Sequence, residues 1–256
     1  MTGPKILVYD VETSPLVSLT WGTFKQNVIK VQQDYRILSV AWRWHGKAKI
    51  YDASIPEWEG FDGDMTNDYG VVATAMDLFD EADIVVAHNG NHFDQPKVLA
   101  RAFLYDMAPP VPYKEVDTLQ LCRRNFKLTS NRLDAVCRDM GIGGKAETGG
   151  ISTWEGCMAG DEKSWRRMVK YNRHDVVLLD QLYTRLQPWA NRSPNLALYG
   201  DRPDACPKCG VIGRMTFKEW RYNAVTRRPI FRCRACRGIV AGRALEKVAV
   251  THTMVP

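Results

Sequence analysis

Apolar residues gather in short continuous runs in the first part of the chain. Runs rich in β-branched residues predict buried strands, and they lie at residues 6–12, 36–44, 47–52 and 84–88. His45 and Gly46 alone separate the second run from the third. We therefore expect these two strands to form a tight antiparallel hairpin.

Helical spacing of apolar residues follows these runs. It predicts helices over residues 71–79, 95–107 and 133–140, and a long helix from an N-cap at Asp161 to about Leu186. Strands that come first and then mix with helices indicate an α/β fold, in which helices cover a mixed sheet. No run reaches the ~18–20 apolar residues of a membrane span, and no signal peptide precedes the first strand. We expect a cytoplasmic protein that does not contact membranes.

Charge is distributed unevenly over the 256 residues. The chain carries 35 Lys and Arg against 29 Asp and Glu, a net charge of +6. Residues 201–256 hold 12 basic and 4 acidic side chains, whereas residues 1–200 hold 23 basic and 25 acidic ones. Residues 193–203 have the Ser, Gly and Pro composition of a linker. These differences predict a slightly acidic main domain joined to a basic module that binds a polyanion.

Three short motifs carry candidate catalytic residues. Asp10 and Glu12 are two apart in the first predicted strand, so their side chains lie on one face. Asp94 opens a helix directly after a buried strand, and Tyr171 and Asp175 are one helical turn apart. Close carboxylates repel each other unless a cation neutralises them, and oxygen ligands suit Mg²⁺ or Mn²⁺. Taken alone, each motif is explained as well by solvated acids and a core tyrosine.

In this order the motifs resemble the DEDD superfamily of exonucleases, the DnaQ-like group with an RNase H-like fold. They read Asp-x-Glu-Thr from Asp10, Asn-Gly-x-x-Phe-Asp from Asn89 and Tyr-x-x-x-Asp from Tyr171. The histidine type of this family has its histidine five residues before the last aspartate, where this chain has Lys170. The tyrosine type has its tyrosine four residues before it, as here. The chain therefore resembles the tyrosine type, and the segments around Trp21 and Tyr35 are similar to phage-encoded members.

The resemblance implies an RNase H-like mixed five-stranded sheet flanked by helices, and phosphodiester hydrolysis with two Mg²⁺ or Mn²⁺ ions. Asp10 would bridge both ions, while Glu12 and Asp175 would complete the site that activates water. Asp94 would support the second ion, and Tyr171 would orient the attacking water. Nucleoside 5′-monophosphates would leave from a 3′ end. The expected substrate is single-stranded or branched DNA, with RNA as an alternative.

Residues 14–34 form an insertion beside the predicted cleft. Trp21 and Phe24 could stack there on a terminal base, since base–aromatic stacking contributes about 1–3 kcal/mol. Packing of both rings into the core of the domain is the favoured expectation.

The seven cysteines fall into two groups. Three are scattered and expected to be small buried residues, namely Cys122, Cys137 and Cys157. The other four form two Cys-x-x-Cys pairs, Cys206 with Cys209 and Cys233 with Cys236. This spacing is typical of four thiolates that hold one structural Zn²⁺. We predict a zinc ribbon over residues 204–242, with an iron–sulfur cluster or a redox pair as alternatives.

Basic and aromatic residues are interleaved between the two cysteine pairs. This pattern is expected of nucleic-acid binding, in which arginines contact phosphates and rings contact bases. No base-reading motif is visible, so binding should be nonspecific and salt-sensitive. The alternative is that the rings pack the ribbon and the arginines are solvated. The candidate contacts are Arg214, Lys218, Trp220, Arg221, Tyr222, Arg227, Arg228 and Arg232.

These observations predict a metal-dependent 3′–5′ exonuclease in residues 1–192, with a DNA-holding ribbon and a tail at 243–256. We expect it to serve the replication, recombination or repair machinery of a bacteriophage in the host cytoplasm. A structure-specific endonuclease on branched DNA is the first alternative, because the RNase H-like fold also serves junction resolvases. A nucleic-acid-binding accessory protein with a vestigial nuclease fold is the second. The presence of four acids and the tyrosine counts against it.

Overall fold

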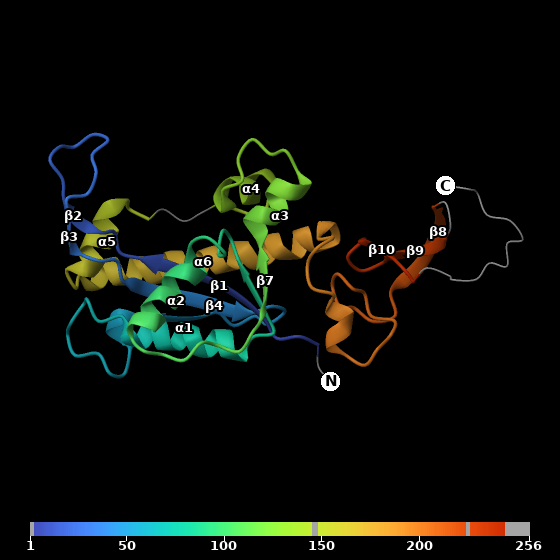
Figure 1. The fold of residues 1–256 in the computed structure, drawn as a ribbon, viewed down its shortest axis with the longest axis horizontal. Helices are drawn as coiled ribbons and strands as arrows, with labels where there is room; N and C mark the ends of the chain where they lie inside the picture. The colour runs from blue at the N-terminus through green and yellow to red at the C-terminus, as the bar shows by residue number, and fades with distance from the viewer. Residues whose placement is uncertain (1–2, 145–147, 224–225, 244–256) are drawn as a thin grey trace, which may run out of the picture. The chain divides into compact units, whose positions relative to one another are not determined.

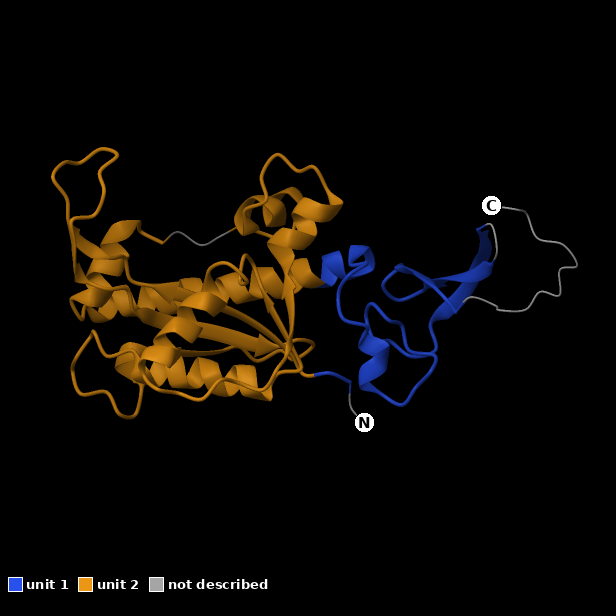
Figure 2. Ribbon diagram, viewed as in Figure 1, with its two compact units in different colours: residues 1–4, 184–256 blue, residues 5–183 orange. Residues whose placement is uncertain are grey.

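The computed structural model describes residues 3–144, 148–223 and 226–243. Beyond residue 243, the expected C-terminal tail lies outside the described residues. The chain divides into two compact units, residues 5–183 and residues 1–4 together with 184–256 (Figure 2). The functional boundaries expected from the sequence stay a prediction.

The larger unit is built on a five-stranded sheet in the order β5-β4-β1-β6-β7 (Figure 1). Its strands are β1 (Ile6–Thr13), β4 (Ile37–Trp44), β5 (Tyr51–Ser54), β6 (Ile84–Ala87) and β7 (Lys114–Asp117). β1 pairs antiparallel with β4 and parallel with β6, so the sheet is mixed. The α/β fold with a mixed five-stranded sheet is therefore confirmed.

Helices cover both faces of this sheet. On one face, α1 (Tyr69–Glu81) and α2 (Asp94–Leu104) pack on β1 residues such as Leu7 and Tyr9 to form the hydrophobic core. On the other face lies α6 (Glu162–Leu186), which hydrogen-bonds to Asp10 of β1 and Ser39 of β4. The shorter elements are α3 (Thr118–Asn125), α4 (Leu133–Asp139), α5 (Ile151–Met158) and the 3-10 helices Ile55–Glu57, Gln187–Trp189 and Leu196–Tyr199. Because side chains alternate along a strand, the acids of β1 point away from the core formed with α1.

Two local predictions can be compared directly with the structure. The N-cap of α6 is confirmed, since the Asp161 carboxylate accepts the amide hydrogen of Ser164 at 2.8 Å. The antiparallel hairpin with a tight turn at His45 and Gly46 is confirmed, since β4 and β5 are antiparallel and the amide of Lys47 donates to the carbonyl of Trp44 at 2.9 Å. The strand ladder ends before this turn, at Trp42 opposite Tyr51. The Arg43 guanidinium donates to the carbonyl of Lys47 at 3.1 Å. The Arg43 side chain thereby occupies the Lys47 carbonyl, which a longer β4–β5 ladder would use as a hydrogen-bond acceptor.

The 14–34 insertion forms a hairpin with a sheet of its own. Its strands are β2 (Val17–Leu19) and β3 (Lys30–Gln33), and they do not join the five-stranded sheet. Trp21 is 89% exposed and Phe24 is 75% exposed, so the expectation that both rings pack into the core is wrong. A separate two-stranded sheet gives these rings no covered face to pack on, since α1 already fills the core face of the main sheet.

The smaller unit contains a three-stranded antiparallel sheet in the order β10-β9-β8. Its strands are β8 (Met215–Tyr222), β9 (Arg227–Cys233) and β10 (Ile239–Ala241). Buried apolar side chains are few here, and Ile230 is the one that the three strands contribute besides Cys233. So small a core needs a covalent or metal cross-link to be stable.

Two further expectations concern single residues and membranes. The scattered cysteines Cys122, Cys137 and Cys157 are all buried, as predicted. Among the described residues, no helix has the length and apolar character needed to cross a bilayer.

Candidate active site and metal centres

Three carboxylates from two distant segments meet at one end of the sheet. Asp10 and Glu12 lie on β1 and Asp175 lies on α6, and their carboxylate oxygens are within 4.8 Å of one another. β1 pairs with β6 only from Ile6 to Val8. Asp10 and Glu12 therefore lie beyond the end of this pairing, where β6 no longer runs beside β1. The carboxyl ends of parallel strands are where sheets of this kind present their ligand sites.

The donor set of this cluster fits a hard divalent cation. Asp175 is buried, and Asp10 and Glu12 are half-buried. Three carboxylates at this separation repel one another in a partly desolvated site. Bound Mg²⁺ or Mn²⁺ would remove that repulsion, and both ions prefer oxygen ligands.

Asn172 fixes the position of Asp10. Its amide Nδ2 donates to Asp10 Oδ2 at 2.7 Å and to the main-chain oxygen of Asp10 at 3.2 Å. Its Oδ1 accepts the Ser39 hydroxyl at 3.0 Å, and both Asn172 and Ser39 are fully buried. Asn172 was not predicted as a site residue from the sequence. The available signal was its place three residues before Asp175, on the same helix face.

Asp94 lies beside this cluster but outside the 4.8 Å group. It is buried at the start of α2, and its Oδ1 accepts the amide hydrogen of Val11 at 3.2 Å. That amide lies between Asp10 and Glu12 along the strand. An acid in the first turn is also favoured by the helix dipole. The hydrogen bond therefore holds the Asp94 carboxylate against the β1 backbone between Asp10 and Glu12.

Tyr171 and α5 form a wall beside Glu12. The buried ring of Tyr171 meets Trp154 edge-on, with 6.5 Å between ring centroids. One turn along α5, Cys157 is buried, and burial together with the charges of Asp161 and Glu12 raises the pKa of its thiol to about 12. Cys157 thus stays protonated at neutral pH.

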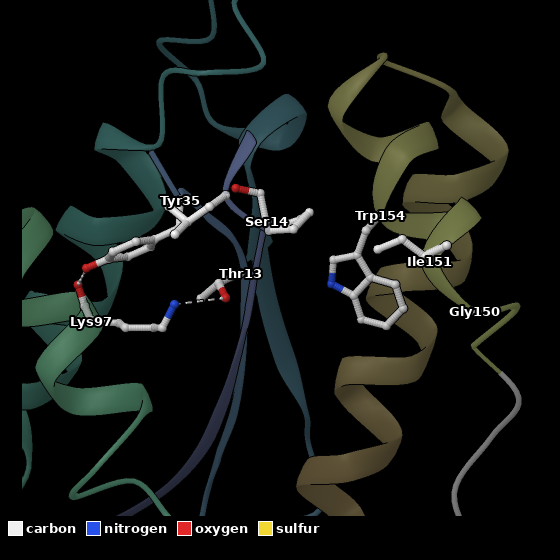
Figure 3. Close-up of a pocket in the computed structure, with 9 residues that line it drawn as sticks. Thr13, Ser14, Tyr35, Lys97, Gly150, Ile151 and Trp154 are labelled. Carbon is white, nitrogen blue, oxygen red and sulfur yellow. Dashed lines mark hydrogen bonds between the residues drawn. The ribbon is translucent and has the colours of Figure 1, made fainter. Parts of the chain in front are cut away.

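A cavity of about 430 Å³ begins directly after Glu12. Tyr35 and Lys97 lie on one side of it and Trp154 on the other, with Thr13 between them (Figure 3). The remaining lining residues are Ser14, Pro15, Leu16, Gly150 and Ile151. The cavity offers aromatic faces and one cation next to the acids.

Lys97 is held in this cavity by neighbouring rings. Its Nζ lies 3.9 Å from the ring centroid of Tyr35 and 4.8 Å from that of Phe93, and donates to Thr13 Oγ1 at 3.5 Å. Burial lowers the pKa of Lys97, while the charges of Asp34 and Asp94 act in the opposite direction. The sequence analysis missed this lysine, although it lies one helical turn after Asp94.

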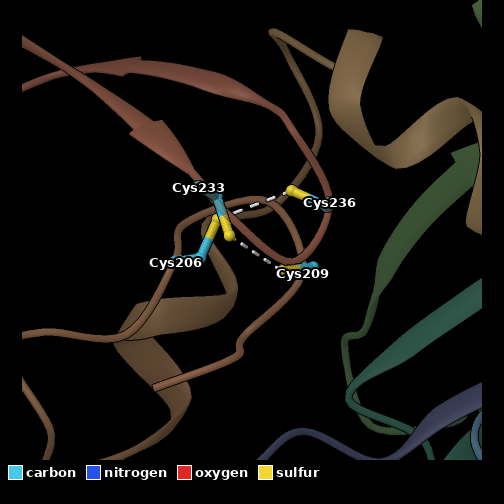
Figure 4. A group of neighbouring side chains, drawn as sticks. All are labelled: Cys206, Cys209, Cys233 and Cys236. Carbon is cyan, nitrogen blue, oxygen red and sulfur yellow. Dashed lines mark hydrogen bonds between the residues drawn. The ribbon is translucent and has the colours of Figure 1, made fainter. Parts of the chain in front are cut away.

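The four paired cysteines converge in the smaller unit (Figure 4). The Sγ atoms of Cys206 and Cys236 are 3.9 Å apart, and those of Cys209 and Cys233 are 3.8 Å apart. Four Zn–S bonds of about 2.3 Å in a tetrahedron require sulfur separations of about 3.8 Å. The cluster therefore fits a single tetrahedral Zn²⁺. A side-chain hydrogen bond from Cys209 lowers the pKa of Cys206 and raises that of Cys209, so the two thiols share one proton in the absence of a metal.

Two equivalent turns present these cysteines. The amide of Gly210 donates to the carbonyl of Cys206 at 2.8 Å, and the amide of Arg237 donates to that of Cys233 at 2.9 Å. Both donors have positive φ, 72° for Gly210 and 66° for Arg237. Each pair is thus held by the same local turn, independently of any large core.

The β8–β9 hairpin separates the candidate nucleic-acid contacts onto two faces. Phe217 lies opposite Phe231, and its ring centroid is 5.6 Å from that of Trp220, so the rings share one face. The Arg227 guanidinium lies 4.7 Å from the Trp220 centroid on that face. Arg221 lies opposite Arg228 on the other face. Among the remaining candidates, Tyr222 lies opposite Arg227, and Arg232 lies opposite Thr216. Lys218 lies at the irregularity in β8, and Arg214 directly precedes this strand.

Comparison with known proteins identifies the family. The family model described as the RNase_H superfamily matches residues 46–187, more than half of the chain, and the chain belongs to this superfamily. Asp94, Tyr171 and Asp175 lie inside the matched segment, whereas Asp10 and Glu12 precede it.

One solved structure with a similar fold is the family B DNA polymerase from the hyperthermophilic archaeon Pyrobaculum calidifontis. The identity is 17% and the TM-score 0.49, over 72% of this chain and 25% of the polymerase chain. The matched part of this chain spans about a quarter of the polymerase's length. No match was found among curated proteins.

Proposed function

We propose that this protein is a metal-dependent 3′–5′ exonuclease that hydrolyses phosphodiester bonds of DNA. The observation that carries the proposal is the meeting of Asp10, Glu12 and Asp175 within 4.8 Å in a chain of the RNase_H superfamily. Membership of this superfamily implies a nucleic-acid substrate. The direction of digestion and the preference for DNA rest on the resemblance of the three motifs to tyrosine-type exonucleases.

Each site residue has a separate task in this proposal. Two bound divalent cations would supply electrostatic stabilisation of the attacking and leaving oxygens. Asp10, Glu12 and Asp175 would hold them, and Asn172 keeps Asp10 in place. Asp94 would support the second ion from the start of α2. The Tyr171 hydroxyl would orient the attacking water by a hydrogen bond.

The cavity beside Glu12 supports cleavage at an end of a strand. Its volume of about 430 Å³ lies in the range of small-ligand pockets. Tyr35 and Trp154 would contact a terminal base and sugar, and Lys97 would attract the adjacent phosphate.

The smaller unit would hold the substrate strand. Exposed arginines such as Arg221 and Arg228 on one face, and aromatic rings on the other, provide contacts for phosphates and bases. The proposed role in strand binding rests on the positive charge of this unit and on the exposure of its aromatic rings. Zinc bound to the four cysteines would have a structural role.

The test uses 5′-labelled single strands with free or blocked 3′ ends, a circular strand and a four-way junction, each with Mg²⁺ or Mn²⁺. A descending ladder from the free 3′ end, with no product from the blocked or circular strands, is the expected result. A discrete cut near the branch of the junction would replace the proposal with an endonuclease. Binding of all substrates without cleavage by either metal would favour an accessory protein. Asp10→Asn serves as the control for a contaminating nuclease.

A further inference from the structure

The β2–β3 hairpin exposes an unusual amount of apolar surface for a chain segment of its size. Six large apolar side chains between its first strand and its last are 46% or more exposed, namely Leu19, Trp21, Phe24, Val28, Ile29 and Val31. Exposed apolar surface gathered in one segment marks an interaction site.

The charge of the hairpin selects the kind of partner. Residues 15–33 contain two cations, Lys25 and Lys30, and no acidic residue. The ammonium of Lys25 lies 5.5 Å from the ring centroid of Phe24. Exposed rings beside cations match unpaired bases joined by phosphates. Two hairpins paired with each other would bring four lysines together, and the nearest acid of each insertion is Asp34 at its base.

The location of the hairpin links it to the candidate active site. Its first strand begins one residue after Leu16, and its second strand ends two residues before Tyr35, and both of these residues line the cavity beside Glu12. Both ends of the hairpin are therefore continuous in sequence with residues that line the cavity.

We propose that the β2–β3 hairpin binds the unpaired nucleotides that precede the 3′-terminal nucleotide of the substrate. Trp21 and Phe24 stack on their bases, and Lys25 and Lys30 attract the intervening phosphates. The inference rests on the proposed exonuclease function and narrows its substrate class to strands with several unpaired nucleotides at the 3′ end.

The test compares Trp21→Ser/Phe24→Ser with a matched control, Phe103→Ser/Leu104→Ser. The control side chains are 82% and 65% exposed on α2 and take no part in the site. Two substrates are used, a 5′-labelled twelve-residue oligothymidylate and the p-nitrophenyl ester of thymidine 5′-monophosphate, which has no preceding nucleotide. The hairpin variant should raise KM for the oligonucleotide about 10-fold for each ring lost. It should leave hydrolysis of the ester within twofold, and the control variant should change neither reaction.

Equal KM values of the hairpin variant and the unaltered protein for the oligonucleotide would overturn the inference. A parallel loss on both substrates would also overturn it, because the hairpin would then act on the site itself. A lower molecular mass of the hairpin variant in sedimentation would identify a second copy as the occupant. If the unaltered protein hydrolyses neither substrate, the proposed function fails. Binding of the labelled oligonucleotide in Ca²⁺, measured by anisotropy, then decides the inference alone, since only the hairpin variant should lose affinity.

Discussion

The two candidate metal centres of this chain are built in opposite ways. The acidic cluster takes its ligands from β1 and α6, which the hydrophobic core positions whether or not a cation is bound. The cysteine cluster takes its ligands from two short turns in a unit with few buried apolar residues. In the first centre the fold brings the ligands together, and in the second we expect a bound metal ion to stabilise the fold.

This difference separates the energetic roles of the two kinds of ion. Without a cation the acidic site contains three carboxylates that repel one another. Binding of a cation there would remove this repulsion, which destabilises the folded chain. A structural zinc site instead supplies folding free energy, about 10–16 kcal/mol for small zinc modules at neutral pH.

The largest effect is expected from removal of zinc. A strong chelator, or Cys206→Ser with Cys209→Ser, should abolish the ordered structure of β8 and β9 and leave residues 5–183 folded. Hydrogen exchange should show lost protection in the β8–β9 hairpin and unchanged protection in β1, β4 and α6. Added Zn²⁺ should restore protection in the chelated protein but not in the variant. Unchanged protection of β8 and β9 without zinc would refute the idea that metal holds this unit together.

Asp10→Asn should show the opposite profile, with activity lost and stability kept. Loss of cation binding should remove about 4 kcal/mol of transition-state stabilisation, a roughly 1,000-fold fall in kcat/KM. In the absence of divalent ions the variant should melt at a temperature equal to or above that of the unaltered protein, because one repelling charge is gone. Added Mg²⁺ should raise the melting temperature of the unaltered protein alone. A variant that unfolds more readily without metal would contradict this account of the site.

Asn172→Ala tests how much the hydrogen bond from Asn172 to Asp10 contributes to positioning this candidate metal ligand. Partners that orient a metal ligand typically contribute 10–100-fold to metal affinity or activity. The Mg²⁺ concentration for half-maximal activity should therefore rise about 10-fold or more, and high Mg²⁺ should restore most of the rate. Ser39→Ala, which removes the next hydrogen bond outward, should have a smaller effect in the same direction. A fall in rate that no Mg²⁺ concentration restores would mean that Asn172 acts on the substrate instead.

The smallest effect is expected from Arg221→Gln with Arg228→Gln in the ribbon. These two cations lie directly opposite each other across β8 and β9, where like charges are destabilising. The double variant should bind single-stranded DNA more weakly, with the slope of log affinity against log salt reduced by about 1–2. The melting transition of the ribbon should stay the same or rise slightly. Lys218→Gln removes one candidate contact whose charge is already paired with Glu219 at 2.9 Å, so it should weaken binding less than the double variant.

The elements that were predicted correctly are those whose own sequence pattern is strong. β1, β6, α1 and α6 have continuous or periodic apolar positions, and Asp161 marks the start of α6. β7 and α5 were not predicted because neighbours determine them. β7 is four residues long with one apolar residue, and α5 contains Gly156, where a Cβ atom would collide with the hydroxyl of Ser164 on α6.

The candidate site shows the same limit. The order and spacing of Asp10, Glu12 and Asp175 predicted that they could meet, and their oxygens do lie together. Asn172 and Lys97 were missed because their contacts with β1 span 162 and 84 residues, and nothing in their local sequence reports such contacts. The exposure of Trp21 was predicted wrongly because apolar composition indicates burial and does not distinguish a core from a binding surface.

The distance along the chain between the halves of the acidic cluster has a consequence during protein synthesis. Asp10 and Glu12 leave the ribosome early, whereas Asp175 and Asn172 follow more than 160 residues later. β1 and β4 can pair long before α6 exists, but the third carboxylate cannot be in place until that helix has emerged. At about 5–20 residues per second, the nascent chain would lack a complete acidic cluster for roughly 8–30 seconds after its first strand appears. A growing chain of this protein could therefore not cleave nucleic acid near the ribosome until most of its domain had been made.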